Sequence, residues 1–112
     1  MRLQWSEIRA RAAAFSERWQ HAGYEKGETH TFYEDFFEVF GVSRRQVANY
    51  EQRVRNLPGD KHGFIDLFWP GTLIVEQKSA GLDLRRASDK ALDYFDLLPE
   101  AQRTRYILTC DF

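Results

Sequence analysis

The chain has 112 residues and a formal net charge of −1 at pH 7, with a sequence pI near 6.3. Hydrophobic residues make up 43% of the sequence and aromatic residues 15%, which is enough for a compact core and excludes an intrinsically disordered chain. The near-neutral charge argues against a strongly basic protein that binds nucleic acid by itself, but it is compatible with one local basic patch.

The sequence shows neither a membrane-spanning segment nor a secretion signal. No apolar run approaches the roughly 20 residues that cross a bilayer, and the N-terminus lacks a basic segment followed by a long apolar run. The single cysteine, Cys110, excludes an intramolecular disulfide and argues against a cysteine-based zinc site. We therefore expect a cytoplasmic protein without a membrane partner.

Two helices are expected in the first 41 residues. The first follows Ser6, a candidate N-cap, and carries apolar residues at steps of three and four as far as Gly23, a stop signal. The second ends at Gly41. Its start is open, because a capping-box spacing places it at Phe32 and an earlier start lies near Gly27.

A third helix is predicted after Ser43. Ser43 and Gln46 have the spacing of a capping box, and the apolar residues that follow recur at helical steps as far as Leu57. The Pro-Gly-Asp triplet at 58–60 then closes the segment.

The rest of the chain predicts a β-hairpin, a helix and a strand. The stretches 62–69 and 72–79 are rich in β-branched and aromatic residues around a Pro-Gly pair, and apolar residues lie on both faces of each strand. A helix from about Leu82 to Leu98 and a strand from Arg105 follow. The predicted class is α/β or α+β, with a small mixed sheet flanked by helices on both sides.

Three charged residues, Asp66, Glu76 and Lys78, interrupt the apolar hairpin. A buried charge is costly unless it is paired, hydrogen-bonded or bound to a metal ion. A two-residue loop pairs Asp66 with Val75 and sends Glu76 to the other face, whereas a three-residue loop or one bulge pairs Asp66 with Glu76. A Pro-Gly turn fits the twist of a two-residue hairpin poorly, which favours the longer loop.

With an odd loop, two carboxylates converge across neighbouring strands, and a divalent cation between them removes their repulsion. Magnesium prefers hard oxygen ligands of this kind, and a bound ion activates water and polarises a phosphate. Lys78 would then stabilise charge on the phosphate, or help to position and deprotonate the water. The alternative is an ordinary salt bridge between Glu76 and Lys78, with Asp66 in the turn, and the spacing alone leaves both open.

Asp66, nine intervening residues and the triplet Glu76-Gln77-Lys78 resemble the D-(x)n-E-x-K signature of the PD-(D/E)XK nuclease superfamily, and the predicted element order resembles its core. The stretches 31–51, 61–81 and 90–95 resemble the N-terminal region of MmeI-like (type IIL) restriction–modification enzymes and related class I DNA methyltransferases. The resemblance implies one nuclease-like domain over residues 1–112, from a larger polypeptide whose methyltransferase and target-recognition parts are absent here.

The resemblance implies a magnesium-dependent DNA endonuclease module, using one or two ions, in a bacterial or archaeal cytoplasm. It implies double-stranded DNA and the other domains of the same polypeptide as partners, with S-adenosylmethionine serving only the absent methyltransferase part. One such site cuts one strand, so double-strand cleavage requires dimerisation or two successive nicks, and we expect little activity from the fragment alone. The alternative is a catalytically silent, nuclease-like scaffold that docks DNA or the methyltransferase part of its own chain.

The resemblance assigns Asp66 and Glu76 to metal binding and Lys78 to catalysis. In many members of the superfamily a further glutamate on the first core helix completes the metal site. Glu28 is the first candidate here and Glu38 the second, and a plain surface glutamate is the alternative for both.

The helix after the motif carries a further feature of the superfamily, Gln-x-x-x-Tyr. Tyr94 matches its tyrosine, but Lys90 occupies the glutamine position. The spacing of four places both residues on one helical face; a lysine there can contact a phosphate, and a solvated Asp89–Lys90 pair is the alternative. The basic residues expected at the DNA backbone, with a solvated helix surface as their alternative, are Lys90, Arg85, Arg86, Arg44 and Arg45.

Overall fold

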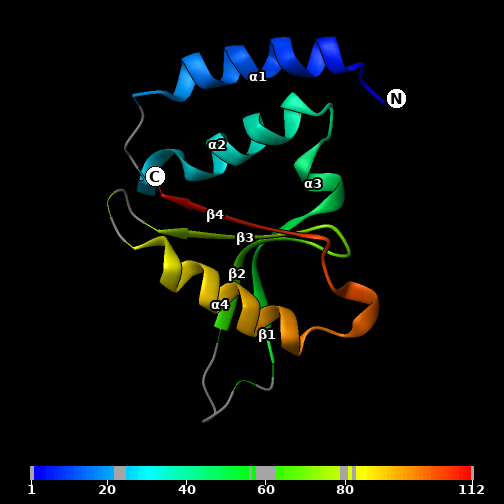
Figure 1. The fold of residues 1–112 in the computed structure, drawn as a ribbon, viewed down its shortest axis with the longest axis vertical. Helices are drawn as coiled ribbons and strands as arrows, with labels where there is room; N and C mark the ends of the chain where they lie inside the picture. The colour runs from blue at the N-terminus through cyan, green and yellow to red at the C-terminus, as the bar shows by residue number, and fades with distance from the viewer. Residues whose placement is uncertain are drawn as a thin grey trace. The chain divides into compact units, whose positions relative to one another are not determined.

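The computed structural model describes residues 2–21, 25–55, 57, 63–78, 81 and 83–111, with side chains left out at 25–27. The elements follow in the order α1 (Trp5–Trp19), α2 (Glu25–Val39), α3 (Arg44–Val47), β1 (Asn49–Val54), β2 (Gly63–Trp69), β3 (Leu73–Lys78), α4 (Leu84–Leu97), the short 3-10 helix η2 (Glu100–Gln102) and β4 (Tyr106–Asp111) (Figure 1). They form two compact units, residues 1–46 with 112 and residues 47–111. None of the described helices has the length and apolarity needed to span a membrane.

In the first unit, aromatic side chains join α1 to α2. The ring of Phe15 lies 5.2 Å from that of Phe32 and 6.0 Å from that of Phe36, measured between centroids, and Trp19 meets Phe32 at 5.5 Å. These contacts use the apolar face predicted for each helix. Because edge-to-face aromatic pairs add to the burial of their surface, the four rings stabilise the pair of helices.

The ends of these helices differ in part from the prediction. The prediction of Ser6 as N-cap is wrong, because α1 begins at Trp5 and Gln4 holds the cap position without a side-chain cap bond. The predicted stop at Gly23 lies outside the described residues. Of the two starts left open for the second helix, the earlier one is correct, since α2 begins at Glu25.

The predicted end of α2 at Gly41 is confirmed. Gly41 has a φ of +72°, a left-handed conformation that costs glycine little. Its N–H donates to the carbonyl of Glu38, and the N–H of Val42 donates to the carbonyl of Phe37. This pair of bonds is the Schellman motif, which satisfies carbonyls that the helix leaves unpaired.

The prediction of a long third helix after Ser43 is wrong. The helix α3 spans only Arg44–Val47, and the residues that follow form strand β1. Tyr50, Gln52 and Val54 alternate with more exposed neighbours along β1, which is the period of a strand. The same segment also fits helical steps, and pairing with β2 decides for the strand.

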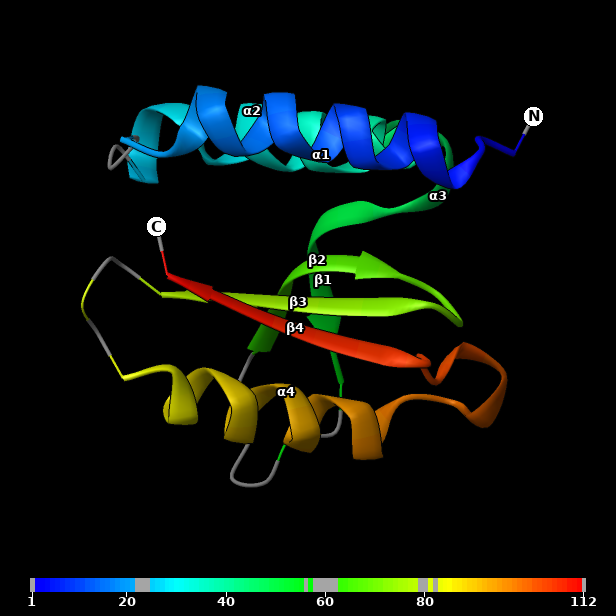
Figure 2. The same ribbon diagram turned by 45° about the horizontal axis from the view of Figure 1, so that its top comes forward.

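The second unit is a four-stranded mixed sheet with the order β1-β2-β3-β4, in which β4 runs parallel to β3 and the other neighbours are antiparallel. Helix α4 packs along β3 and β4 on one face (Figure 2). The buried core on this side consists of Val54, Ile65, Phe68, Ile74, Ala91, Tyr94 and Leu98. The predicted fold class, α/β or α+β with a small mixed sheet, is confirmed; within this unit, α4 covers one face of the sheet.

Helix α4 begins close to its expected position. Asp83 is its N-cap and accepts a hydrogen bond of 2.9 Å from the backbone N–H of Arg85, as short polar side chains do at helix starts. Ala87 and Ala91 are fully buried, and Tyr94 on the same helix is buried as well. The predicted start at Leu82 lies outside the described residues.

Candidate functional site

The loop of the β2–β3 hairpin has three residues. Trp69 pairs with Leu73, which leaves Pro70, Gly71 and Thr72 between the strands. The N–H of Thr72 donates to the carbonyl of Trp69 at 2.9 Å, and Gly71 has a φ of +77°. These are the features of a type II turn, with proline and then glycine in its central positions. The odd loop expected from the sequence is confirmed.

This register sets Asp66 opposite Glu76. Leu67 pairs with Val75 in the ladder, and Asp66 and Glu76 occupy the next position along the two strands. Two hydrogen bonds cross between them: the backbone N–H of Asp66 donates to Glu76 Oε1 at 3.4 Å, and the backbone N–H of Gln77 donates to Asp66 Oδ2 at 2.8 Å. Each carboxylate is therefore oriented by the backbone of the opposite strand. The alternative that placed Asp66 in the turn is wrong.

The alternation of the strands is interrupted at Asp66. Ile65 and Phe68 belong to the same core beside α4, although an odd number of positions separates them. Across the β1–β2 ladder, Glu51 and Asp66 share the one position that is not paired, and Glu51 has a φ of +52°. A left-handed non-glycine residue is uncommon and costs roughly 1–2 kcal/mol. Glu51 thus marks a backbone irregularity directly opposite the site.

Glu76 is a buried acid with one oxygen left without a hydrogen bond. Its exposed fraction is 1%, and Oε2 has no hydrogen-bond partner among the described residues. Burial and the neighbouring Asp66 together raise the pKa of Glu76 to about 8, and the positive charge of Lys90 only partly opposes them. The site therefore holds a carboxyl group that resists ionisation unless a cation compensates its negative charge.

Lys90 approaches this carboxyl group from α4. Its Nζ lies 3.6 Å from Glu76 Oε2 and 5.5 Å from the centre of the Tyr94 ring. Burial by itself lowers the pKa of Lys90, but the charges of Glu76 and Tyr94 outweigh it, so the net shift is upward. Lys90 and Tyr94 share a helical face as expected. The ion pair of Lys90 is made with Glu76, and not with its exposed neighbour Asp89.

Lys78 is the last residue of β3. It lies two positions beyond Glu76 and therefore on the same face of the strand. It is half-buried and stands in register with Asp111 of β4. Neither a hydrogen bond nor an ion pair joins its side chain to another part of the chain that the structure describes. The salt bridge between Glu76 and Lys78 that the sequence left open is not formed.

One comparison with known proteins gives a result. The family model described as "MmeI, N-terminal domain" matches residues 10–112. The chain belongs to the MmeI N-terminal domain family. Neither a curated protein nor a solved structure matches the chain. The expected relation to the N-terminal part of a restriction–modification enzyme is thereby confirmed, and membership of the PD-(D/E)XK superfamily stays a prediction.

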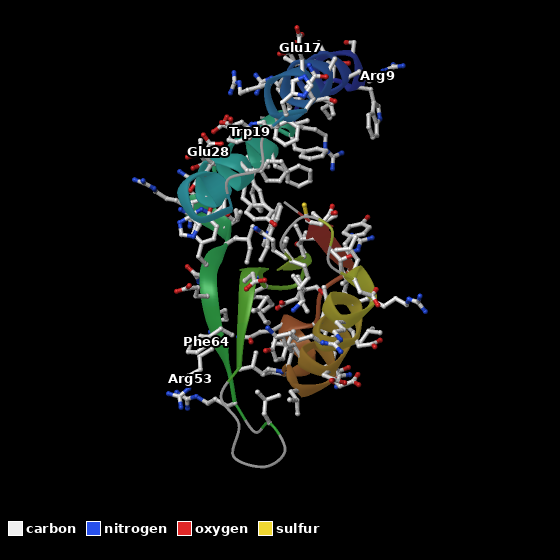
Figure 3. All side chains as sticks on the ribbon, turned by 90° about the vertical axis from the view of Figure 1, so that its left-hand side faces the viewer. Arg9, Glu17, Trp19, Glu28, Arg53 and Phe64 are labelled. Carbon is white, nitrogen blue, oxygen red and sulfur yellow. The ribbon has the colours of Figure 1, made fainter. Side chains whose placement is uncertain are left out.

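Both candidates for the third acid, which the resemblance to the PD-(D/E)XK superfamily implies, belong to the first unit. Glu28, which is labelled in Figure 3, and Glu38 both lie on α2, and both side chains are exposed. Among the described residues, no three side chains of His, Cys, Asp or Glu gather into a group that could hold a metal ion. The assignment of either glutamate to a metal therefore stays a prediction.

The basic residues proposed to contact DNA fall into two groups. Arg44 is only 15% exposed and forms an ion pair of 2.7 Å with Glu34 within the first unit, while Arg45 is exposed. Arg85 and Arg86 are exposed in the first turn of α4. Since this turn follows the strand that carries the motif, only the second group shares a unit with the acidic pair.

Sequence reasoning missed two features of the site. The irregular residue Glu51 falls in the segment that the sequence predicts as a helix, because Tyr50 and Val54 also fit helical steps. The contact between Lys90 and Glu76 had no sequence signal, because it depends on how α4 packs across β3.

Proposed function

We propose that this MmeI N-terminal domain is a magnesium-dependent DNA endonuclease module of the PD-(D/E)XK type, which supplies the restriction activity of a fused restriction–modification enzyme. The observation that carries the proposal is the position of Asp66 opposite Glu76, with Glu76 Oε2 buried and without a hydrogen bond. Two adjacent carboxylates repel each other unless a cation compensates them. Two carboxylates, completed by water and phosphate oxygens, are a donor set that suits magnesium.

Each charged residue of the hairpin has its own role in the proposed reaction. Asp66 and Glu76 hold the ion, and the N–H groups of Gln77 and Asp66 fix the directions of their carboxylates. The ion, when bound, polarises the scissile phosphate and makes a water molecule more acidic. Lys78, on the same face, stabilises charge on the phosphate and positions the attacking water.

The exposed arginines next to the site suit the DNA backbone. Arg85 and Arg86 lie at the start of α4, a few residues after Lys78, and phosphate contacts need cations of this kind. The substrate is double-stranded DNA in the cytoplasm. Sequence reading and methylation, with S-adenosylmethionine, belong to other domains of the same polypeptide.

A second candidate function is a silent, nuclease-like scaffold. One observation favours it: no third metal-ligating side chain joins the acidic pair among the described residues, and a lysine lies against Glu76. Such a domain would dock DNA or its own methyltransferase part without cutting.

Titration calorimetry with magnesium, compared between the unmodified chain and the variants Asp66→Ala and Asp89→Ala, tests the proposed site. We expect Asp66→Ala to weaken binding by more than about tenfold, since even outer-shell partners of metal ligands cost 10–100-fold. Asp89→Ala removes an exposed carboxylate outside the hairpin and should change little. Binding that is indifferent to Asp66→Ala would refute the site.

A DNA cleavage assay tests the proposed activity. In the polypeptide that joins this domain to its methyltransferase, Lys78→Ala should abolish magnesium-dependent cutting of DNA while methylation survives. Cutting that persists at the original rate in Lys78→Ala would leave the scaffold as the better account.

A further inference from the structure

Lys90 stands between a buried acid and solvent. Its side chain is 42% exposed, whereas that of Glu76 is 1% exposed, and 3.6 Å separates Lys90 Nζ from Glu76 Oε2. Lys90 comes from α4 and Glu76 from β3, so the contact joins the helix to the motif strand across the core. The ammonium therefore covers the acidic pair on the side of α4.

The contact involves one particular oxygen. Glu76 Oε1 already accepts a hydrogen bond from the backbone N–H of Asp66, while Oε2 accepts none. At 3.6 Å the ammonium compensates the charge of Oε2 without making a short hydrogen bond. A divalent cation that binds the pair therefore gains most by contacting Oε2.

We propose that Lys90 is a built-in counter-ion of the Asp66–Glu76 pair, which holds the two carboxylates together in the metal-free protein and gives way when a divalent cation binds. The second half of this inference rests on the proposed function, and the first half does not. A glutamine at this position donates hydrogen bonds but carries no charge, so it cannot compensate two carboxylates. The flexible, partly exposed lysine side chain can move into solvent without a change in the backbone.

The inference predicts opposite effects on stability and on metal affinity. Without the ammonium, the two carboxylates repel each other when both are ionised, and the metal-free fold loses stability. The incoming cation, however, no longer competes with a positive charge, so its affinity rises. A merely structural lysine would predict a loss of stability with unchanged or weaker metal binding.

The test compares Lys90→Met with Arg105→Met, a matched control that removes the same charge from an exposed residue of the same unit. Measurements are made on the whole chain, at the same pH for all variants. In EDTA, Lys90→Met should unfold at a lower urea concentration than the unmodified chain. In calorimetry with magnesium or manganese, it should bind roughly tenfold more tightly. Arg105→Met should show neither effect.

Metal affinity in Lys90→Met that equals or falls below that of the unmodified chain would overturn the competition. The counter-ion role has its own measurement, a double-mutant cycle of Lys90→Met and Glu76→Gln in EDTA. A stability coupling between the two changes supports the role, and additive effects refute it. If the unmodified chain binds no metal, the proposed function is refuted. The double-mutant cycle still tests the counter-ion role of Lys90 in that case.

Discussion

Glu76 shows what a single buried side chain does to the hairpin. Its charge stands out in the sequence because it breaks an apolar run, and its spacing from Asp66 and Lys78 is visible there too. Its environment is not, since burial and the contact with Lys90 arise from the packing of α4 on the sheet. The residue types and their spacing were therefore visible in the sequence, whereas their electrostatic environment was not.

The raised pKa of Glu76 predicts how stability depends on pH. The folded chain keeps a proton on Glu76 up to about pH 8, while the unfolded chain releases it near 4.5. Because the folded state binds more protons between these values, the free energy of unfolding falls as the pH rises through this window, by at most about 1.4 kcal/mol per pH unit from this group. Glu76→Gln removes that dependence and should be more stable than the unmodified chain at the alkaline end.

Urea unfolding across the window, in EDTA, measures the effect. Glu38→Gln is the control, because Glu38 is exposed and lies outside the hairpin. Parallel curves for Glu76→Gln and the unmodified chain would contradict the prediction.

Strand β1 is the element that sequence reasoning missed. Its apolar residues satisfy both helical and strand periods, and local pattern cannot choose between them. The choice comes from partners distant in the sequence, since β1 pairs with β2 from Asn49–Phe68 to Val54–Gly63. The hairpin, by contrast, could be predicted with its loop length, because the turn residues Pro70 and Gly71 lie within the segment that they organise.

The positive φ of Glu51 predicts that the usual order of stability between glycine and alanine variants in a strand is reversed at this position. In an ordinary strand, glycine is less stable than alanine by roughly 0.5–1 kcal/mol. At a φ of +52°, however, alanine pays the left-handed penalty of roughly 1–2 kcal/mol and glycine does not. We therefore expect Glu51→Gly to be more stable than Glu51→Ala by up to about 1 kcal/mol.

Arg53 provides the matched control for Glu51. It lies two residues further along β1, opposite Phe64, and its φ is negative (Figure 3). Arg53→Gly should be less stable than Arg53→Ala. Urea denaturation of the four variants gives both differences, and the same order at the two positions would show that the backbone of Glu51 is not strained.

At the scale of the whole molecule, the sequence predicted a mixed sheet with flanking helices, and it placed the motif on the correct hairpin. It did not reveal the division into two compact units, of which the first contains Glu28 and Glu38 and the second contains the acidic pair. Helix patterns report which residues are apolar, but the partner of each apolar face is set by tertiary packing.

The distribution of charge over the molecule predicts where DNA binds. With a net charge of −1, the chain has little general attraction for DNA, so binding depends on local cations. Arg85 and Arg86 are exposed at the start of α4, a few residues after the motif strand in the sequence. Replacing both by alanine should weaken binding to a short duplex and reduce the slope of log affinity against log salt concentration by about two, close to one per lost phosphate contact.

The double variant Arg2→Ala and Arg9→Ala is the control for the two α4 arginines. It removes the same charge from exposed residues of the first unit and should leave the salt slope unchanged. Fluorescence anisotropy at several salt concentrations measures both slopes. If both double variants reduce the slope of log affinity against log salt concentration equally, Arg85 and Arg86 act only through net charge. A loss of phosphate contacts would instead be specific to Arg85 and Arg86.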